Sequence, residues 1–296
     1  MKKIIIAGGT GFLGNALKAY FQNQNIQIIS LSRKRTPDTT YWNGSELGEW
    51  TKHLEDSDVL INLAGKSVDC RYNDTNRKAI HDSRIYSTRV LNLAMQQAIS
   101  KPKVFLNAST ATIYAHSETQ INTEENGTLG DDFSTGIAKA WEKEFFSVQL
   151  DGVRKVAMRT SIVLGNDGGA FPMLKKTTKL GMGGKQGRGN QFISWIHVQD
   201  FCRAVDFLIH ADLEGAVNVT APNPMQNENF MKLLSQQLNV PFRIDQPKWL
   251  LEIGAIFIGT ETELLLKSRY VYPQHLMNSG FTFKYDTVES CLSDLV

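Results

Sequence analysis

The sequence has little cysteine, and its few cysteines are scattered. Cys70, Cys202 and Cys291 form neither a C-x-x-C pair nor a cluster with histidine. That spacing argues against a disulfide framework and against a zinc site. The histidines also lack ligand-like spacing to a cysteine or to one another. We therefore expect free, structural thiols and no bound metal.

Long apolar runs and an excess of one charge are also absent. No stretch of about 18 apolar residues occurs, so no membrane-spanning helix is expected. The apolar run in the opening segment MKKIIIAGGTGFLG is only about five residues, which is shorter than a secretory signal requires. The 32 basic and 30 acidic residues leave a net charge of +2, which gives no reason to expect nucleic acid or a membrane as partner. We expect a cytoplasmic protein, monomer or dimer, whose partner is a small-molecule substrate.

Apolar strands alternate with amphipathic helices over the first two hundred or so residues. The expected strands are 3–7, 26–30, 59–64, 103–108, 155–161 and 216–219, and the expected helices are 15–22, 77–99, 131–150 and 200–210. This βαβ alternation predicts an α/β fold, a Rossmann-type doubly wound parallel sheet. Its ligand crevice should lie beyond the carboxyl ends of the strands.

The character of the chain changes after Pro222 and Pro224. Helices are expected at 229–238 and over most of 248–269, with interruptions at Gly254 and Gly259. Prolines and topology thus predict a nucleotide-binding domain at 1–221 and a smaller, mainly helical substrate lobe at 222–296. A glycine-rich stretch at about 165–190 is expected to be either a lid over the substrate crevice or an inert flexible loop.

A glycine-rich motif joins the first predicted strand to the helix after it. It reads Gly8, Gly9, Thr10, Gly11, Phe12, Leu13 and Gly14. Glycines permit a tight turn and let the backbone approach a pyrophosphate, while the helix amino terminus presents free N–H groups. Because the motif lies at the first turn of a βαβ pattern, it predicts dinucleotide binding rather than a merely structural turn.

The end of the second predicted strand carries the information on cofactor choice. An acidic residue here would bind the ribose 2′-hydroxyl of NAD. This sequence instead has Ser32, Arg33, Lys34 and Arg35. Three cations and a hydroxyl suit a 2′-phosphate, because guanidinium groups bind phosphate oxygens in a forked geometry. We therefore expect NADP(H); the alternative is a solvated basic turn.

Further motifs carry a resemblance to a known family over nearly the whole chain. They are DVLINLAG at 58–65, ASTATIY at 108–114 and SWIHVQD at 194–200. Together with the glycine loop they resemble the extended short-chain dehydrogenase/reductases, the NAD-dependent epimerase/dehydratase family. DSR at 82–84, RTSIVLG at 159–165, Gly183-Gly184 and TAPNP at 220–224 look like its atypical bacterial "epimerase family protein" subgroup, which carries its own carboxyl-terminal domain.

The resemblance implies roles for several residues. Leu63, Ala64 and Gly65 would line the adenine-ribose and pyrophosphate side of the cofactor. Arg84 would stand where typical members carry an asparagine. Thr110 would be the hydroxyl that holds a substrate oxygen over the nicotinamide.

The family's general acid/base is a tyrosine followed four residues later by a lysine and, four further on, by a glutamate. Aligning Glu142 with that glutamate places Ser134 at the tyrosine position and Ala138 at the lysine position, so the pair is missing. Lys139 is one residue away, about 100° around a helix. If chemistry occurs, another acid must serve.

Five residues near the expected crevice are candidates for that acid: Tyr114, His116, Asp131, Asp132 and Lys139. Each also has an ordinary structural explanation, such as a packed aromatic ring, a helix cap or a solvated helix charge. His197 and Asp200 suggest a dyad, but Asp200 is equally expected to cap the helix that starts at Phe201.

Three functions stay open from the sequence. The first is an NADP(H)-dependent oxidoreductase or epimerase-like enzyme acting on a small polar substrate, for instance a nucleotide sugar. The second is a non-catalytic NADP(H)-binding sensor or interaction protein that has lost the acid/base pair. The third is a nucleotide-sugar isomerase that retains its cofactor through the cycle.

Overall fold

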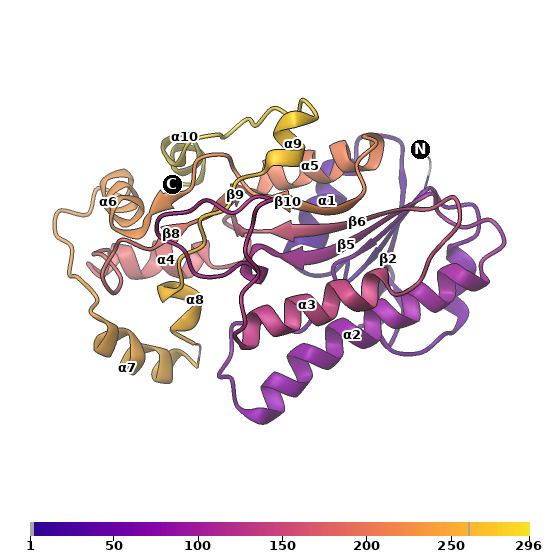
Figure 1. The fold of residues 1–296 in the computed structure, drawn as a ribbon, viewed down its shortest axis with the longest axis horizontal. Coiled ribbons are helices and arrows are strands. Elements are labelled where there is room, and N and C mark those ends of the chain that lie inside the picture. Colours follow the sequence, from indigo (N-terminus) through magenta and orange to yellow (C-terminus); the bar gives the residue numbers. More distant parts are fainter. Residues whose placement is uncertain (1–2, 260) are drawn as a thin grey trace.

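The computed structural model describes residues 3–259 and 261–296, and its centre is a seven-stranded sheet (Figure 1). Its strands are β1 (Lys3–Ala7), β2 (Gln27–Ser32), β3 (Thr40–Tyr41), β4 (Val59–Asn62), β5 (Val104–Thr110), β6 (Arg154–Thr160) and β10 (Gly215–Val219). They are all parallel and lie in the order β10-β6-β5-β4-β1-β2-β3. The chain moves outward from β1 to β3 and then returns to place β4 on the other side of β1. This order confirms the predicted doubly wound α/β fold. In folds of this kind ligands bind beyond the carboxyl ends of the strands, at that reversal.

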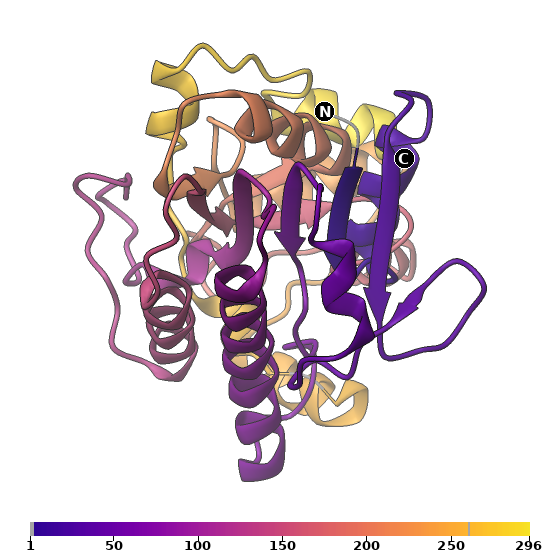
Figure 2. The ribbon, with the colours of Figure 1, turned by 90° about the vertical axis from the view of Figure 1, so that its right-hand side faces the viewer.

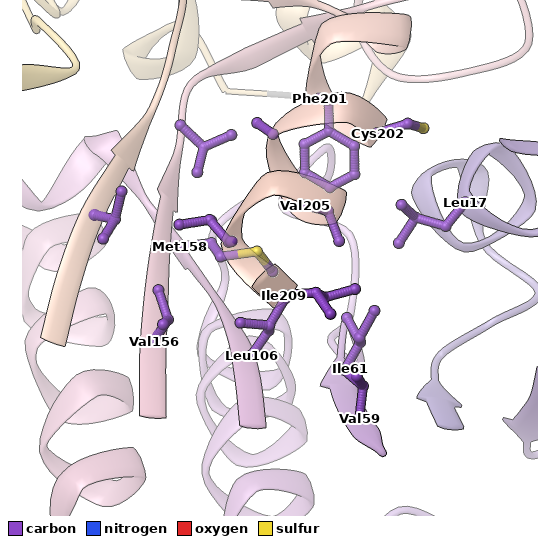
Figure 3. Close-up of a cluster of buried hydrophobic side chains, with 14 of the residues drawn as sticks. Leu17, Val59, Ile61, Leu106, Val156, Met158, Phe201, Cys202, Val205 and Ile209 are labelled. Atoms are coloured by element: carbon purple, nitrogen blue, oxygen red, sulfur yellow. The ribbon is translucent and has the colours of Figure 1, made fainter. Parts of the chain in front are cut away.

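Helices cover both faces of the sheet, as Figures 1 and 2 show from two sides. On one face, α1 (Phe12–Phe21) and α5 (Val198–His210) pack on Ile4 and Ile6 of β1. On the other, α2 (Asp74–Gln97) and α3 (Phe133–Phe146) cover Ile5 and Ala7. Because neighbouring side chains in a strand point to opposite faces, a strand buried on both faces is mostly apolar. Figure 3 shows the core beneath α5, where Phe201 and Val205 lie over Met158 and Leu106.

The carboxyl-terminal part of the chain is built from helices. They are α6 (Asn227–Gln237), α7 (Lys248–Ile258), α8 (Glu263–Leu266), α9 (Gln274–Asn278) and α10 (Val288–Leu295). Phe230 of α6 and Val288 of α10 share a core with Leu164 and Trp195 from the preceding part. The 1–221 boundary stays a prediction, and this shared core shows that the two parts pack as neighbours. No helix in the described ranges is long and apolar enough to cross a membrane.

Several short elements complete the fold. They are the 3-10 turns η1 (Glu49–His53) and η2 (Ala111–Ile113), the helix α4 (Phe171–Lys179), and the paired strands β7 (Ile162–Leu164) with β9 (Trp195–His197) and β8 (Phe192–Ile193) with β11 (Met225–Gln226). The helix α4 lies inside the glycine-rich stretch. Gly184 of that stretch donates its N–H to Ile244 O, 3.1 Å away, and a Cβ there would lie 2.4 Å from the same oxygen. At least part of the stretch is therefore packed against the carboxyl-terminal part.

Residues 268–272 run back beside the first part of the chain. The backbone N–H of Arg269 donates to Phe192 O at 2.9 Å, and Asn122 N–H donates to Tyr270 O at 2.7 Å. Phe192 and Tyr270 also stack, with ring centroids 3.9 Å apart. This segment was expected to continue a helix as far as Arg269. The helix α8 instead ends at Leu266, because the following backbone is hydrogen-bonded to neighbouring segments.

Candidate functional site

Three glycines of the loop, Gly8, Gly9 and Gly14, stand where a side chain would be strained or would collide with neighbouring atoms. Gly8 has a φ of +79°, and a Cβ at Gly9 would lie 2.7 Å from Ser30 Oγ. At Gly14 a Cβ would lie 2.6 Å from Gly9 Cα, so the start of α1 sits directly on the loop. Gly11, the residue before α1, has no side chain to cap the first N–H groups of the helix. Bare backbone and uncapped helix N–H groups at the end of β1 fit the pyrophosphate of a dinucleotide.

Three strand ends meet at this loop. Gly8 N–H donates to Leu31 O at the end of β2, and a Cβ on Gly8 would lie 3.0 Å from the backbone of Leu63 and Ala64 after β4. Phe12 of the loop packs against Gly168, where a Cβ would lie 2.7 Å from the Phe12 ring. The structure therefore gathers the predicted cofactor-contacting segments at the reversal point of the sheet. Their contacts with a cofactor stay a prediction.

The predicted 2′-phosphate residues lie at the end of β2, beside the glycine loop. Ser32 is buried, lies 3.4 Å from Thr10 Oγ1, and accepts the backbone N–H of Lys34 at 3.0 Å. The side chains of Arg33, Lys34 and Arg35 are exposed. The Arg35 guanidinium lies over the Tyr41 ring of β3 at 4.1 Å from its centroid. A buried serine anchor with cations around it can receive a phosphate group.

Arg84 of α2 lies against the segment that follows β4. Its guanidinium carbon would lie 3.3 Å from a Cβ at Gly65, directly after β4. Nη1 donates to the carbonyls of Lys66 and Ile80, both at 3.0 Å, and the guanidinium stacks over Trp141. Burial lowers the pKa of Arg84 to about 10, which still leaves it charged at neutral pH. A cation fixed in this place can interact with a cofactor or a substrate oxygen.

Thr110 ends β5 and caps the short turn η2. Its Oγ1 accepts the backbone N–H of Thr112 at 3.1 Å, and its side chain is half-buried. A hydroxyl that accepts this bond keeps its own hydrogen for donation. The position at the carboxyl end of a central strand agrees with the substrate-orienting role that the resemblance implies, and that role stays a prediction.

Tyr114, a candidate acid, is enclosed in the protein. It has no exposed surface, donates its hydroxyl hydrogen to Asn218 Oδ1 at 2.9 Å and accepts from Arg159 Nη1 at 2.9 Å. Burial raises its pKa. Arg159 in turn binds Glu142 through two hydrogen bonds of 2.8 Å. These contacts favour the packed-aromatic explanation of Tyr114 over an acid that meets substrate.

At the start of α3, Ser134 and Ala138 stand at the two positions of the family's acid/base pair. Asp132 caps the helix, since its Oδ1 accepts the Thr135 N–H at 2.9 Å. Ala138, at the lysine position, is fully buried in a cluster with Ile113 and Tyr114. The neighbouring Lys139 side chain is exposed. The lysine position thus faces apolar core, where an ammonium group would be costly.

The remaining candidates do not form a catalytic group. Asp131 is exposed, and His116 accepts the Ser268 N–H at 3.0 Å. His197 caps α5, which begins at Val198 and not at Phe201, so the expected Asp200 cap is wrong. Asp200 has no exposed surface and accepts the backbone N–H groups of residues 284 and 285 at 2.9 and 2.7 Å. These bonds favour a structural role for both residues of the suspected dyad.

One group of polar side chains beside α3 was not predicted from the sequence. Tyr72 is hydrogen-bonded to the Ser134 side chain, and Lys267 forms an ion pair with Asp132. Burial lowers the pKa of Lys267 to about 8 and that of Arg269 to about 10. Arg269 Nε is buried and has no hydrogen-bond partner among the described residues. The group could not be found from spacing, because Tyr72 and Arg269 come from distant parts of the chain.

The similarities to known proteins agree with this geometry. Residues 4–220 match the NAD dependent epimerase/dehydratase family. The chain belongs to this family. Residues 246–295 match a domain of unknown function, DUF1731. The family assignment confirms the resemblance expected from the motifs, including the separate carboxyl-terminal domain.

Individual relatives match over all or nearly all of this chain. The chain is 34% identical over 301 residues to the epimerase family protein SERP0438 of Staphylococcus epidermidis, covering all of this chain and 99% of the relative. The structure of the human epimerase family protein SDR39U1 (isoform 2) with NADPH has a TM-score of 0.90 at 27% identity and covers 99% of this chain and 98% of that one. The nucleoside-diphosphate sugar epimerase of Corynebacterium glutamicum has a TM-score of 0.81 at 29% identity, over 99% of this chain and 57% of that one.

Proposed function

We propose that this protein is an NADP(H)-dependent oxidoreductase or epimerase-like enzyme that acts on a small polar substrate, for instance a nucleotide sugar. The observation that carries the proposal is the combination of the closely packed glycines Gly8, Gly9 and Gly14 (the glycine cradle) with a buried Ser32 and exposed Arg33, Lys34 and Arg35 beside them. The cradle suits a pyrophosphate, and the cations suit a 2′-phosphate. Support also comes from the human relative that was crystallised with NADPH.

Thr110 is the residue of this chain that would orient the reactive oxygen. Its hydroxyl stands at the carboxyl end of β5, in the sheet edge that also holds the glycine cradle. A bound NADPH would supply hydride chemistry, and the protein would supply orientation and charge. The relative from Corynebacterium glutamicum, named as a nucleoside-diphosphate sugar epimerase, supports a nucleotide sugar as one substrate class to try.

The cofactor assignment is tested by fluorescence titration with NADPH and NADH. We expect wild type to bind NADPH more tightly than NADH, and Arg33→Ala to weaken NADPH binding about tenfold while leaving NADH unchanged, because the lost contact is to a charged phosphate. Arg243→Ala, an exposed arginine in the carboxyl-terminal part, is the matched control. Equal affinity for both cofactors, unchanged by Arg33→Ala, would overturn the NADP(H) assignment.

A second candidate is a non-catalytic NADP(H)-binding sensor. The observation that favours it is Ala138, which fills the lysine position of the family's acid/base pair with buried apolar surface. This alternative predicts tight cofactor binding without turnover. Oxidation of bound NADPH stimulated by a defined carbonyl compound or sugar, and slowed by Thr110→Ala, would exclude it. Retention of the cofactor without net NADPH consumption would instead indicate an isomerase.

A further inference from the structure

Tyr72 is held at the start of α3 by three parts of the chain. Its ring packs edge-on against Phe133 with centroids 5.1 Å apart, and its hydroxyl is hydrogen-bonded to the Ser134 side chain. Its backbone N–H donates to Glu261 Oε1 at 2.7 Å, and its carbonyl accepts from Arg77 Nε at 2.7 Å. These contacts fix both the backbone and the ring of Tyr72. The phenol is therefore positioned, and its position is the helix end nearest the missing acid/base pair.

The positive charges of two partly buried arginines act on the phenol. Arg84 and Arg269 each interact electrostatically with Tyr72. Arg84 also lies against Gly65 at the end of β4, which ties this group of side chains to the cofactor crevice. Burying a cation is costly unless something compensates it. Glu263 compensates Arg269 in part, and a phenolate at Tyr72 would add to the compensation of both cations.

Burial and nearby acidic groups oppose that phenolate. Burial raises the pKa of Tyr72 most, the hydrogen bond with Ser134 lowers it, and the carboxylates of Glu263 and Glu261 raise it further. The phenol is therefore protonated at neutral pH, so the hydroxyl can give a proton but does not take one. A group of this kind suits a reduction, in which the substrate oxygen gains a proton.

We infer that the Tyr72 hydroxyl is the proton donor of a carbonyl reduction, and that Arg84 and Arg269 stabilise the phenolate left behind. The inference rests on the proposed function. When bound, NADPH supplies a hydride to the carbonyl carbon. The carbonyl oxygen then takes the proton from Tyr72 Oη, the electron pair of the broken O–H bond stays on Oη, and a proton from water restores the phenol.

The inference requires that Tyr72 lie beside the nicotinamide ring of the bound cofactor. The charge of that ring should then change the pKa of Tyr72, which can be measured. Tyrosine labelled with carbon-13 at Cζ reports ionisation of each phenol by NMR, and Tyr72→Phe identifies the Tyr72 signal. Because the ring is a cation in NADP⁺ and neutral in NADPH, we expect NADP⁺ to lower the pKa of Tyr72 by about one unit or more relative to NADPH. Tyr86, 43% exposed on the same helix that carries Arg84, is the internal control and should titrate alike in both.

A second variant tests the two cations. Arg269→Gln should raise the pKa of Tyr72 in the cofactor-free protein, because it removes a neighbouring positive charge. Arg243→Gln should leave it unchanged. An unchanged Tyr72 pKa in Arg269→Gln would overturn the role of that guanidinium. Equal Tyr72 titration with NADP⁺ and NADPH, when both cofactors are seen to bind, would overturn the donor role alone, whereas failure to bind either cofactor would overturn the proposed function.

Discussion

Gly14 and Gly136 are both helical glycines, and their surroundings are opposite. A Cβ at Gly14 would collide with the Gly9 backbone at 2.6 Å, whereas nothing lies within 4 Å of one at Gly136. We expect Gly14→Ala to weaken NADPH binding about tenfold or more, since α1 must move off the cradle. Gly136→Ala should leave binding unchanged and raise the free energy of unfolding by about 0.5–1 kcal/mol. Fluorescence titration and urea unfolding measure both, and equal behaviour of the two variants would contradict the close-packed loop.

The buried imidazole of His197 is expected to make the free energy of unfolding depend on pH. Burial lowers its pKa below the ordinary value of about 6.5, and its Nε2 lies 3.2 Å from Asp294. The unfolded chain therefore binds a proton near pH 6.5, while the folded protein does so only at lower pH. The stability from the neutral ring is full above pH 6.5 and is lost as the pH falls from there through the folded pKa.

Urea unfolding between pH 7 and pH 5 checks this expectation. The free energy of unfolding should fall less steeply with decreasing pH in His197→Gln than in wild type. His210→Gln, which changes an exposed histidine at the end of the same helix, should keep the wild-type slope. A wild-type slope in His197→Gln would show that other groups determine the acid sensitivity.

At the scale of elements, one buried ion pair fastens α3 to the sheet. Glu142 of α3 binds Arg159 of β6, with side chains 12% and 10% exposed, and also accepts the Ser109 hydroxyl of β5 at 2.6 Å. Glu142→Ala leaves Arg159 buried without its carboxylate, so we expect a loss of about 3–5 kcal/mol in the free energy of unfolding. Glu144→Ala removes a pair with the exposed Arg89 from the same helix and should cost about 1 kcal/mol or less. Comparable losses in the two variants would show that burial does not decide the cost.

The main elements follow from local patterns, and this explains which of them were predictable. The strand expected at 3–7 is confirmed as β1, because a strand buried on both faces is mostly apolar. The helix α1 begins at Phe12, three residues earlier than expected, since the glycine loop itself enters the helix. Gly254 does not interrupt α7, which shows that an isolated glycine is tolerated inside a helix. The strands β7, β8, β9 and β11 have two or three residues each and are too short for any periodicity to appear.

The candidate site also has a part that the sequence predicts and a part that it does not. The glycine cradle was predictable, since steric demands on Gly8 and Gly14 act within a few residues or on the adjacent strand end. Tyr72 was not, because its partner Glu261 lies 189 positions further along the chain. Spacing patterns describe one element at a time, and this part of the site is assembled from several.

For the whole molecule, the shared core makes the first 221 residues dependent on the rest. Leu164, Phe171 and Trp195 are fully buried in a cluster with residues of α6 and α10. A chain that ends at residue 221 would expose this apolar surface, so we expect it to aggregate or to unfold at lower temperature than the full chain. Size-exclusion chromatography and thermal unfolding measure this. A monomeric fragment with the melting temperature of the full chain would show that the domain is independent.

The placement of Tyr72 against Ser134 and Glu261 has a consequence for how the protein comes into being. All the strand ends that meet in the glycine cradle, from Gly8 to Ala64, lie in the first quarter of the chain. The groups around Tyr72 are complete only when Glu261 and Arg269 have followed. During synthesis, the segments of the proposed nucleotide site are therefore made well before the residues that surround the proposed proton donor.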